Sequence, residues 1–87
     1  MFNGFFYTTH FKKCYKNLSL QVRDRVKKTL RLLADNPHHP SLRMKKMEGT
    51  ADIWEVWVSM DMRITFQIRS DVLVLRKVGK HDILKNP

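Results

Sequence analysis

The fold is decided by the stretch Met62-Arg63-Ile64-Thr65-Phe66-Gln67-Ile68-Arg69, because apolar and polar residues alternate through it without interruption. Successive side chains of a β-strand point to opposite faces, so this pattern predicts a half-buried strand with one apolar and one polar face. A similar alternation runs from Ile53 to Ser59, and a nearly continuous apolar run follows from Val72 to Val78. Such a run suits a central strand. The second half of the chain therefore predicts a β-sheet.

The alternation also predicts how the first two of these strands pair. Their core-facing residues must lie opposite one another, so Val58 is expected opposite Ile64. A tight two-residue loop at Met60-Asp61 would instead bring Val58 opposite Arg63 and mix the two faces. The sequence therefore predicts a longer loop or a bulge there. The polar face of this strand pair then carries Glu55, Trp57, Arg63, Thr65 and Gln67.

The first half of the chain predicts two helices. Thr8 or Thr9 is expected to cap the first, whose apolar face is formed by Phe11, Cys14, Tyr15 and Leu18. Ser19 is expected to cap the second, whose apolar stripe contains Val22, Val26, Leu30 and Leu33. Asn36-Pro37 ends this helix, because the residue before a proline avoids the α region.

Two further stretches complete the predicted fold. Phe2 to Tyr7 is predicted as a short strand, and Leu42 to Met47 as another before a turn at Glu48-Gly49-Thr50. The order β-α-α-β-β-β-β predicts an α+β fold in which two N-terminal helices pack on one face of a mainly antiparallel sheet of four to five strands. The other face is then polar, cationic and partly aromatic, and it is the candidate working surface.

The composition limits the class of protein. A chain of 87 residues predicts a single domain over residues 1–87. Lys and Arg number 17 against 8 Asp and Glu, and the formal net charge of +9 favours a polyanion or an acidic protein as partner. Cys14 is the one cysteine, so no intrachain disulfide or Cys-based zinc site is available, which fits the cytoplasm. No apolar run approaches the roughly 18 residues that span a membrane, and neither a metal nor a small-molecule cofactor is expected.

The polar face carries residue types that suit RNA. A phosphate backbone needs cations, and an unpaired base stacks on an aromatic ring. Cleavage of RNA without a metal needs a base for the 2′-hydroxyl proton, cations for the charged intermediate and an acid for the leaving oxygen. His81 is the natural acid or base, because imidazole exchanges protons near neutral pH. The cationic and aromatic candidates are Arg43, Lys45, Lys46, Trp57, Arg63 and Arg76.

Each assignment has a structural alternative. His81 reads equally as a solvated residue, and Arg63 as an ordinary polar strand residue. Trp57 is an equally good packing partner for a helix, the C-terminal tail or another protein. His38 and His39, between prolines, read as a loop rather than as metal ligands.

Six stretches of the chain match one family pattern in order and spacing. They are Phe11-Lys12-Lys13, Leu32-Leu33-Ala34-Asp35-Asn36-Pro37, Leu42-Arg43-Met44-Lys45-Lys46-Met47-Glu48-Gly49, Ile53-Trp54-Glu55-Val56, Met62-Arg63-Ile64-Thr65-Phe66 and Val78-Gly79-Lys80-His81-Asp82-Ile83-Leu84. Over nearly its full length the chain thus resembles the RelE/ParE superfamily of toxins. The resemblance implies that the chain is the toxin of a type II toxin–antitoxin pair. Such a toxin cuts mRNA in the ribosomal A site, and its antitoxin wraps it. ParE-like members share the fold but inhibit DNA gyrase.

The resemblance also implies residue roles. Arg63 matches the arginine of the family's Tyr-Arg-Leu-Val-Tyr-like strand, which contacts the reacting phosphate. His81 matches the late arginine or histidine that serves as catalytic acid in ribosome-dependent members, and Asp61 matches an acidic position of the YafQ branch. The predicted catalytic residues are therefore His81, Arg63 and Lys45. The predicted RNA-binding residues are Arg43, Lys46, Trp57, Asp61 and Arg76.

The sequence departs from the family pattern in two places. Where RelE carries lysines along a strand, this chain reads Trp54-Glu55-Val56-Trp57-Val58, and Trp57 stands where related chains often carry Arg or His. The stretch after His81 also lacks the late tyrosine of RelE and YoeB. Two alternatives to an mRNA endonuclease follow, namely a ParE-like gyrase inhibitor and a catalytically inactive binding or regulatory protein.

Overall fold

The computed structural model describes residues 2–87, and its elements follow the predicted order. They are β1 (Gly4–Tyr7), α1 (Thr9–Lys16), α2 (Leu20–Asp35), the 3₁₀-helix η1 (Pro40–Leu42), β2 (Lys45–Lys46), β3 (Trp54–Trp57), β4 (Met62–Arg69), β5 (Val72–Lys80) and the 3₁₀-helix η2 (His81–Lys85). The chain therefore has the predicted α+β composition. None of the helices in this range is both long enough and apolar enough to cross a membrane.

The sheet is mixed rather than wholly antiparallel. Its five strands lie in the order β1-β5-β4-β3-β2, and β1 runs parallel to β5 while the other neighbours are antiparallel. The predicted antiparallel arrangement is thus confirmed from β2 to β5 and wrong at β1. The direction of β1 carries no local signal, because it is set by pairing with β5, which lies more than 60 residues later in the chain.

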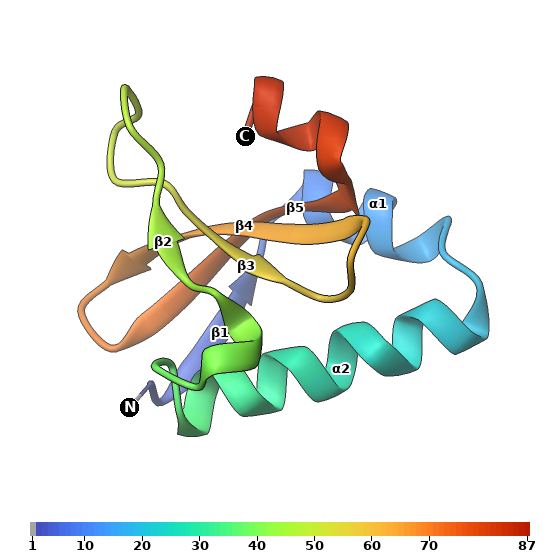
Figure 1. Cartoon of the computed structure of the whole chain (residues 1–87), viewed down its shortest axis with the longest axis horizontal. Helices are drawn as coiled ribbons and strands as arrows, with labels where there is room; N and C mark the ends of the chain where they lie inside the picture. The colour runs from blue at the N-terminus through green and yellow to red at the C-terminus, as the bar shows by residue number, and fades with distance from the viewer. Residues whose placement is uncertain (1) are drawn as a thin grey trace.

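The helices are arranged differently from the prediction. Figure 1 shows α2 beneath the sheet and η2 above it, while α1 packs against β5 at the far side. Thr8 and Ser19 cap the two α-helices, since their hydroxyl oxygens each accept a hydrogen bond of 3.2 Å from the backbone three residues later. The main core lies between α2 and the sheet and contains Val26, Leu30, Leu33, Leu42, Val56, Ile64, Phe66, Leu73, Leu75 and Val78.

The pairing of β3 with β4 differs from the predicted register but keeps the predicted faces. Val56, not Val58, lies opposite Ile64, and the backbone N–H of Val58 donates to the carbonyl of Met62 at 2.9 Å. A shift of two residues leaves every side chain on its predicted face. The loop of residues 59–61 is longer than a two-residue turn, as predicted.

A bulge in β5 explains how the continuous apolar run is accommodated. Thr65 pairs with Lys77, yet the next residue, Phe66, pairs with Leu75, so Arg76 is the extra residue. The bulge changes the alternation, and Leu75 and Val78 both reach the core although they are three positions apart.

The predicted strand from Leu42 to Met47 is mostly wrong. Leu42 ends η1 with its side chain 1% exposed, and Arg43 follows in the left-handed region with φ 46°. Only Lys45–Lys46 forms a strand, β2. Burial of Leu42 in the core outweighs the weak strand pattern here.

Candidate functional site

The sheet face opposite α2, called the outer face below, carries two rows of side chains. The strand pairing aligns Lys45, Glu55, Thr65 and Lys77 in one row. It aligns Trp57, Arg63 and Gly79 in the next. Residues paired across strands point to the same face, so the predicted polar face is present.

Trp57 lies between two guanidinium groups. The Arg63 carbon Cζ is 3.7 Å from the centroid of the Trp57 ring, and Cζ of Arg43 is 4.2 Å from it. Both separations are well inside the range of cation–π attraction. Because the two cations occupy this ring, an RNA base reaches the face of Trp57 only after one of them moves.

Arg63 is a buried residue, only 4% exposed. Its Nη1 donates to the carbonyl of Ser59 at 2.8 Å and to those of Met60 and Met62 at 3.0 Å each, so this arginine holds the β3–β4 loop closed. Its Nε is buried and has no hydrogen-bond partner within residues 2–87. A buried donor without an acceptor is unfavourable by about 1–3 kcal/mol, and because this Nε is buried, a phosphate oxygen reaches it only if the residues that cover it move.

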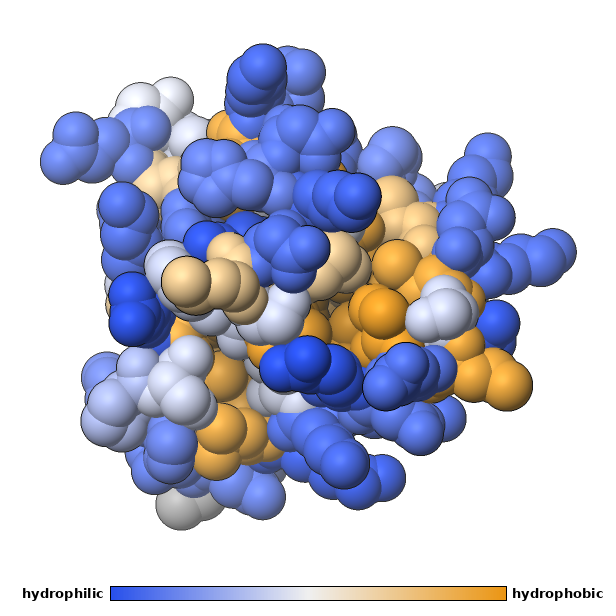
Figure 2. Space-filling model, turned by 45° about the vertical axis from the view of Figure 1, so that its right-hand side comes forward, coloured by the Kyte–Doolittle hydropathy of each residue, from blue (hydrophilic) through white to orange (hydrophobic). Residues whose placement is uncertain are grey.

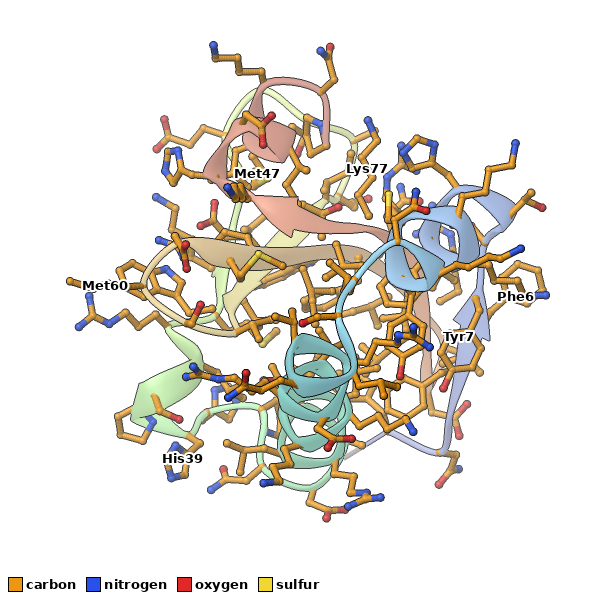
Figure 3. The ribbon with its side chains drawn as sticks, turned by 90° about the vertical axis from the view of Figure 1, so that its right-hand side faces the viewer. Phe6, Tyr7, His39, Met47, Met60 and Lys77 are labelled. Carbon is orange, nitrogen blue, oxygen red and sulfur yellow. The ribbon has the colours of Figure 1, made fainter. Side chains whose placement is uncertain are left out.

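The C-terminal segment covers one half of the outer face. Thr65 Oγ1 and Arg76 Nε donate to the Pro87 carbonyl at 3.2 and 3.1 Å, and Lys77 Nζ donates to the carbonyl of Asn86. A Cβ on Gly79 would lie 2.8 Å from Ile83 Cγ2, so η2 packs directly on this glycine. We call Thr65, Arg76, Lys77 and Gly79 the covered half, and Figures 1 and 3 show η2 and Lys77 on this side of the sheet.

The other half of the outer face is open. Arg43 and Lys45 are exposed there, and we call these two residues the open half. Lys45 also lines a hollow of about 280 Å³ together with Glu55, which is 6% exposed. Lys46 lines the same hollow, and its Nζ lies 3.0 Å from Oδ1 of Asp52. Lys46 is therefore paired with a carboxylate, whereas Lys45 is not in an ion pair within residues 2–87.

Glu55 is a site residue that the sequence prediction missed. It sits between Lys45 and Thr65 in the cross-strand row. The strand alternation had placed it on the polar face, but nothing in the local sequence indicated burial. That burial depends on neighbours from β2 and β4, which lie far away in sequence.

His81 and Asp61 lie at one end of the outer face. Met62 pairs with Lys80 in the final pair of β4 and β5, so Asp61 and His81 each come one residue beyond that pair. Both side chains are exposed, and Asp61 Oδ1 accepts a hydrogen bond of 3.0 Å from Ser59 Oγ. Arg63 pairs with Gly79 just inside the same end. The predicted catalytic pair, Arg63 and His81, is thus brought to the same end of the sheet.

The surface of the molecule is mixed in hydropathy. Figure 2 shows hydrophilic side chains over most of the visible face, with apolar patches between them. Within the part of the chain that the structure describes, no three His, Cys, Asp or Glu side chains gather as a metal site. The ionisable side chains at or beside the outer face include cations, the imidazole of His81 and the carboxylates of Glu55 and Asp61.

No protein-family model matches the chain, and no curated protein is significantly similar to it in sequence. Solved structures do match. YafQ from E. coli strain BL21(DE3) has 18% sequence identity, with 97% of this chain and 98% of that chain covered and a TM-score of 0.76. The YoeB/ParE toxin from Agrobacterium tumefaciens has 11% identity, 91% and 99% coverage and a TM-score of 0.77.

A third match comes from a complex. The intact E. coli RelBE toxin–antitoxin complex contains a chain with 23% identity to this one, covering 87% of this chain and 93% of that chain at a TM-score of 0.69. Matches of this quality over nearly whole chains show that the protein has the fold of the RelE/ParE toxins.

Proposed function

We propose that this chain, which has the fold of the RelE/ParE toxins, is a single toxin domain over residues 1–87 and the toxin of a type II toxin–antitoxin pair. Its proposed activity is metal-independent cleavage of mRNA on the ribosome, which blocks translation in the cytoplasm. The observation that carries the proposal is the convergence of Arg63, Asp61 and His81 at one end of an outer face whose other half exposes Arg43 and Lys45.

The proposed reaction is an attack of the RNA on itself. The 2′-hydroxyl passes its proton to the exposed carboxylate of Asp61, which acts as the general base, and the 2′-oxygen bonds to the adjacent phosphorus. The bond to the 5′-oxygen breaks, and a 2′,3′-cyclic phosphate remains. His81, which is exposed, donates the proton that the leaving 5′-oxygen needs. Lys45, which is exposed, and Arg63, once the residues that cover its Nε move, stabilise the extra negative charge on the phosphate.

RNA binding is proposed to use the open half first. Arg43 and Lys45 are exposed, whereas Arg76 is held by Pro87 and by Gln67, whose Oε1 accepts from Arg76 Nη1 at 3.1 Å. A phosphate contact from Arg76 therefore requires the C-terminal segment to move. The proposed protein partner is a cognate antitoxin, because the matched E. coli RelE chain is part of a toxin–antitoxin complex.

The test compares His81→Ala with His10→Ala. His10 is also exposed and lies on α1, where it lines a hollow with Arg76 in the middle of β5, whereas His81 follows the end of β5. It therefore serves as a control for the loss of an exposed imidazole at another place on the molecule. Both variants are expected to keep the wild-type circular dichroism spectrum. Only His81→Ala is expected to lose mRNA cleavage on programmed ribosomes, by about 100-fold or more for a missing general acid, and to relieve growth arrest.

Two other results would replace the proposal. Inhibition of gyrase supercoiling by the wild-type protein, without mRNA cleavage, would assign it to the ParE-like function. Absence of both activities and of growth arrest would identify an inactive binding or regulatory protein.

A further inference from the structure

A hollow beside η1 shares Arg43 with the open half but contains none of the other groups assigned above. It encloses about 280 Å³, and its lining includes His38, His39, Arg43 and Trp54. Ligand pockets usually measure roughly 300–1,000 Å³, so this hollow suits a single flat ring system rather than a whole nucleotide. Arg43 connects it to the outer face, because its guanidinium also stacks on Trp57.

Arg43 is held in place with its hydrogen-bonding edge available. Its backbone adopts φ 46° and its N–H donates to the Pro40 carbonyl at 3.2 Å, which fixes where the side chain starts. The guanidinium lies 4.2 Å from the Trp57 centroid, and it donates to no group within residues 2–87. A guanidinium so placed offers two parallel N–H groups to a ligand.

His39 adds a second donor of known orientation. The backbone N–H of Ser41 donates to His39 Nδ1 at 3.2 Å, and Ser41 Oγ lies 2.8 Å from the same atom. A backbone N–H only donates, so Nδ1 is the acceptor, and the neutral ring carries its proton on Nε2. Figure 3 shows His39 at the surface, beneath the loop that carries Met60.

We propose that the hollow binds one nucleobase of an RNA strand and prefers guanine. The inference rests on the proposed function for its substrate class, RNA, but not for catalysis. Arginine pairs bidentately with O6 and N7 of guanine, whereas adenine presents an amino donor where guanine has O6. The two donors here, from Arg43 and His39, therefore suit guanine better than adenine. The flat side chains of Trp54 and His38 suit stacking.

The experiment is a titration followed by two-dimensional NMR of the ¹⁵N-labelled full chain. The ligands are 5′-GMP, 5′-AMP and ribose 5-phosphate, added separately without ribosomes. 5′-GMP is expected to shift the Trp54 indole N–H and the His39 ring signals and to bind about tenfold more tightly than 5′-AMP, which is within the discrimination of a bidentate arginine–guanine pair. Ribose 5-phosphate is expected to leave both signals in place.

Variants test the two donors separately. Arg43→Lys keeps the charge but loses the planar fork, so the preference for 5′-GMP over 5′-AMP is expected to disappear. His39→Ala is expected to weaken 5′-GMP binding several-fold, while the control His10→Ala is expected to change nothing. Ser41→Ala keeps the backbone N–H that fixes the His39 tautomer, so it is expected to bind like the wild type.

Three outcomes would overturn the inference. Equal shifts with ribose 5-phosphate would mean a phosphate site. Equal affinity for the two nucleotides would remove the guanine preference. Shifts of Trp54 with a purified antitoxin but not with 5′-GMP would assign the hollow to a protein partner. Loss of mRNA cleavage has no bearing on any of these readouts, so a failed catalytic proposal and a failed base site are distinguishable.

Discussion

Two regions of the molecule each place an arginine against Trp57, and the two arginines differ in burial and in hydrogen bonding. Strand β4 contributes Arg63, which is buried and donates to three backbone carbonyls of the preceding loop and strand end. The η1 segment contributes Arg43, which is exposed and fixed by its backbone and by the aromatic ring. The comparison shows that two arginines on one aromatic ring differ in their hydrogen bonds: those of Arg63 also support a loop, whereas the guanidinium of Arg43 keeps its donors for a ligand.

The largest effect is expected from Arg63→Ala. The substitution removes the charged donor that the carbonyls of Ser59, Met60 and Met62 share. Hydrogen bonds to charged groups contribute about 1.5–3 kcal/mol, so the free energy of unfolding is expected to fall by about that amount. Urea denaturation measures this loss of stability. Wild-type stability would show that the loop closes without Arg63, and would free this arginine for a purely functional role.

A somewhat smaller effect is expected from Gly79→Ala in the covered half. The new Cβ meets Ile83 Cγ2 at 2.8 Å, and overpacking of this kind typically reduces stability by about 1–3 kcal/mol. Amide hydrogen exchange is expected to rise in residues 81–87 because η2 is pushed off the sheet. The double variant Gly79→Ala/Ile83→Ala should recover part of the protection, and an unchanged exchange rate in the single variant would argue against close packing of η2.

A several-fold effect on RNA binding is expected when the two halves of the outer face are compared directly. Lys45→Ala removes an exposed cation, so the salt dependence of single-stranded RNA binding should become shallower by about 0.7 in log–log slope. Lys77→Ala removes an equal charge, but Lys77 Nζ already donates to the Asn86 carbonyl. The slope of RNA binding against salt for this variant should therefore stay near that of the wild type. Fluorescence anisotropy at several salt concentrations measures the slopes of both variants. Equal slopes would show that the covered half opens readily.

The smallest effect on stability is expected from Arg43→Ala. Its contribution to folding is one exposed cation–π contact, worth about 0.5–1 kcal/mol. The same urea measurement as for Arg63→Ala checks it. A loss as large as that of Arg63→Ala would erase the distinction between the two arginines.

The amino-acid sequence by itself determined which residues face the core. The alternation of β4, the helical spacing of α2 and the caps Thr8 and Ser19 all predicted the observed elements, because periodicity and capping act over neighbouring residues. The polar face with Glu55, Trp57 and Arg63 followed from the same local rule. So did a loop of more than two residues between β3 and β4.

Only the tertiary structure decided how these faces are covered and connected. The parallel β1, the bulge at Arg76, the burial of Arg63 and Glu55, and the C-terminal segment over Thr65 carry no local pattern. The hydrogen bond from Thr65 to Pro87, for example, joins residues 22 positions apart. The periodicity of a strand determines to which face each side chain points. Which segment packs against that face depends on contacts between distant parts of the chain.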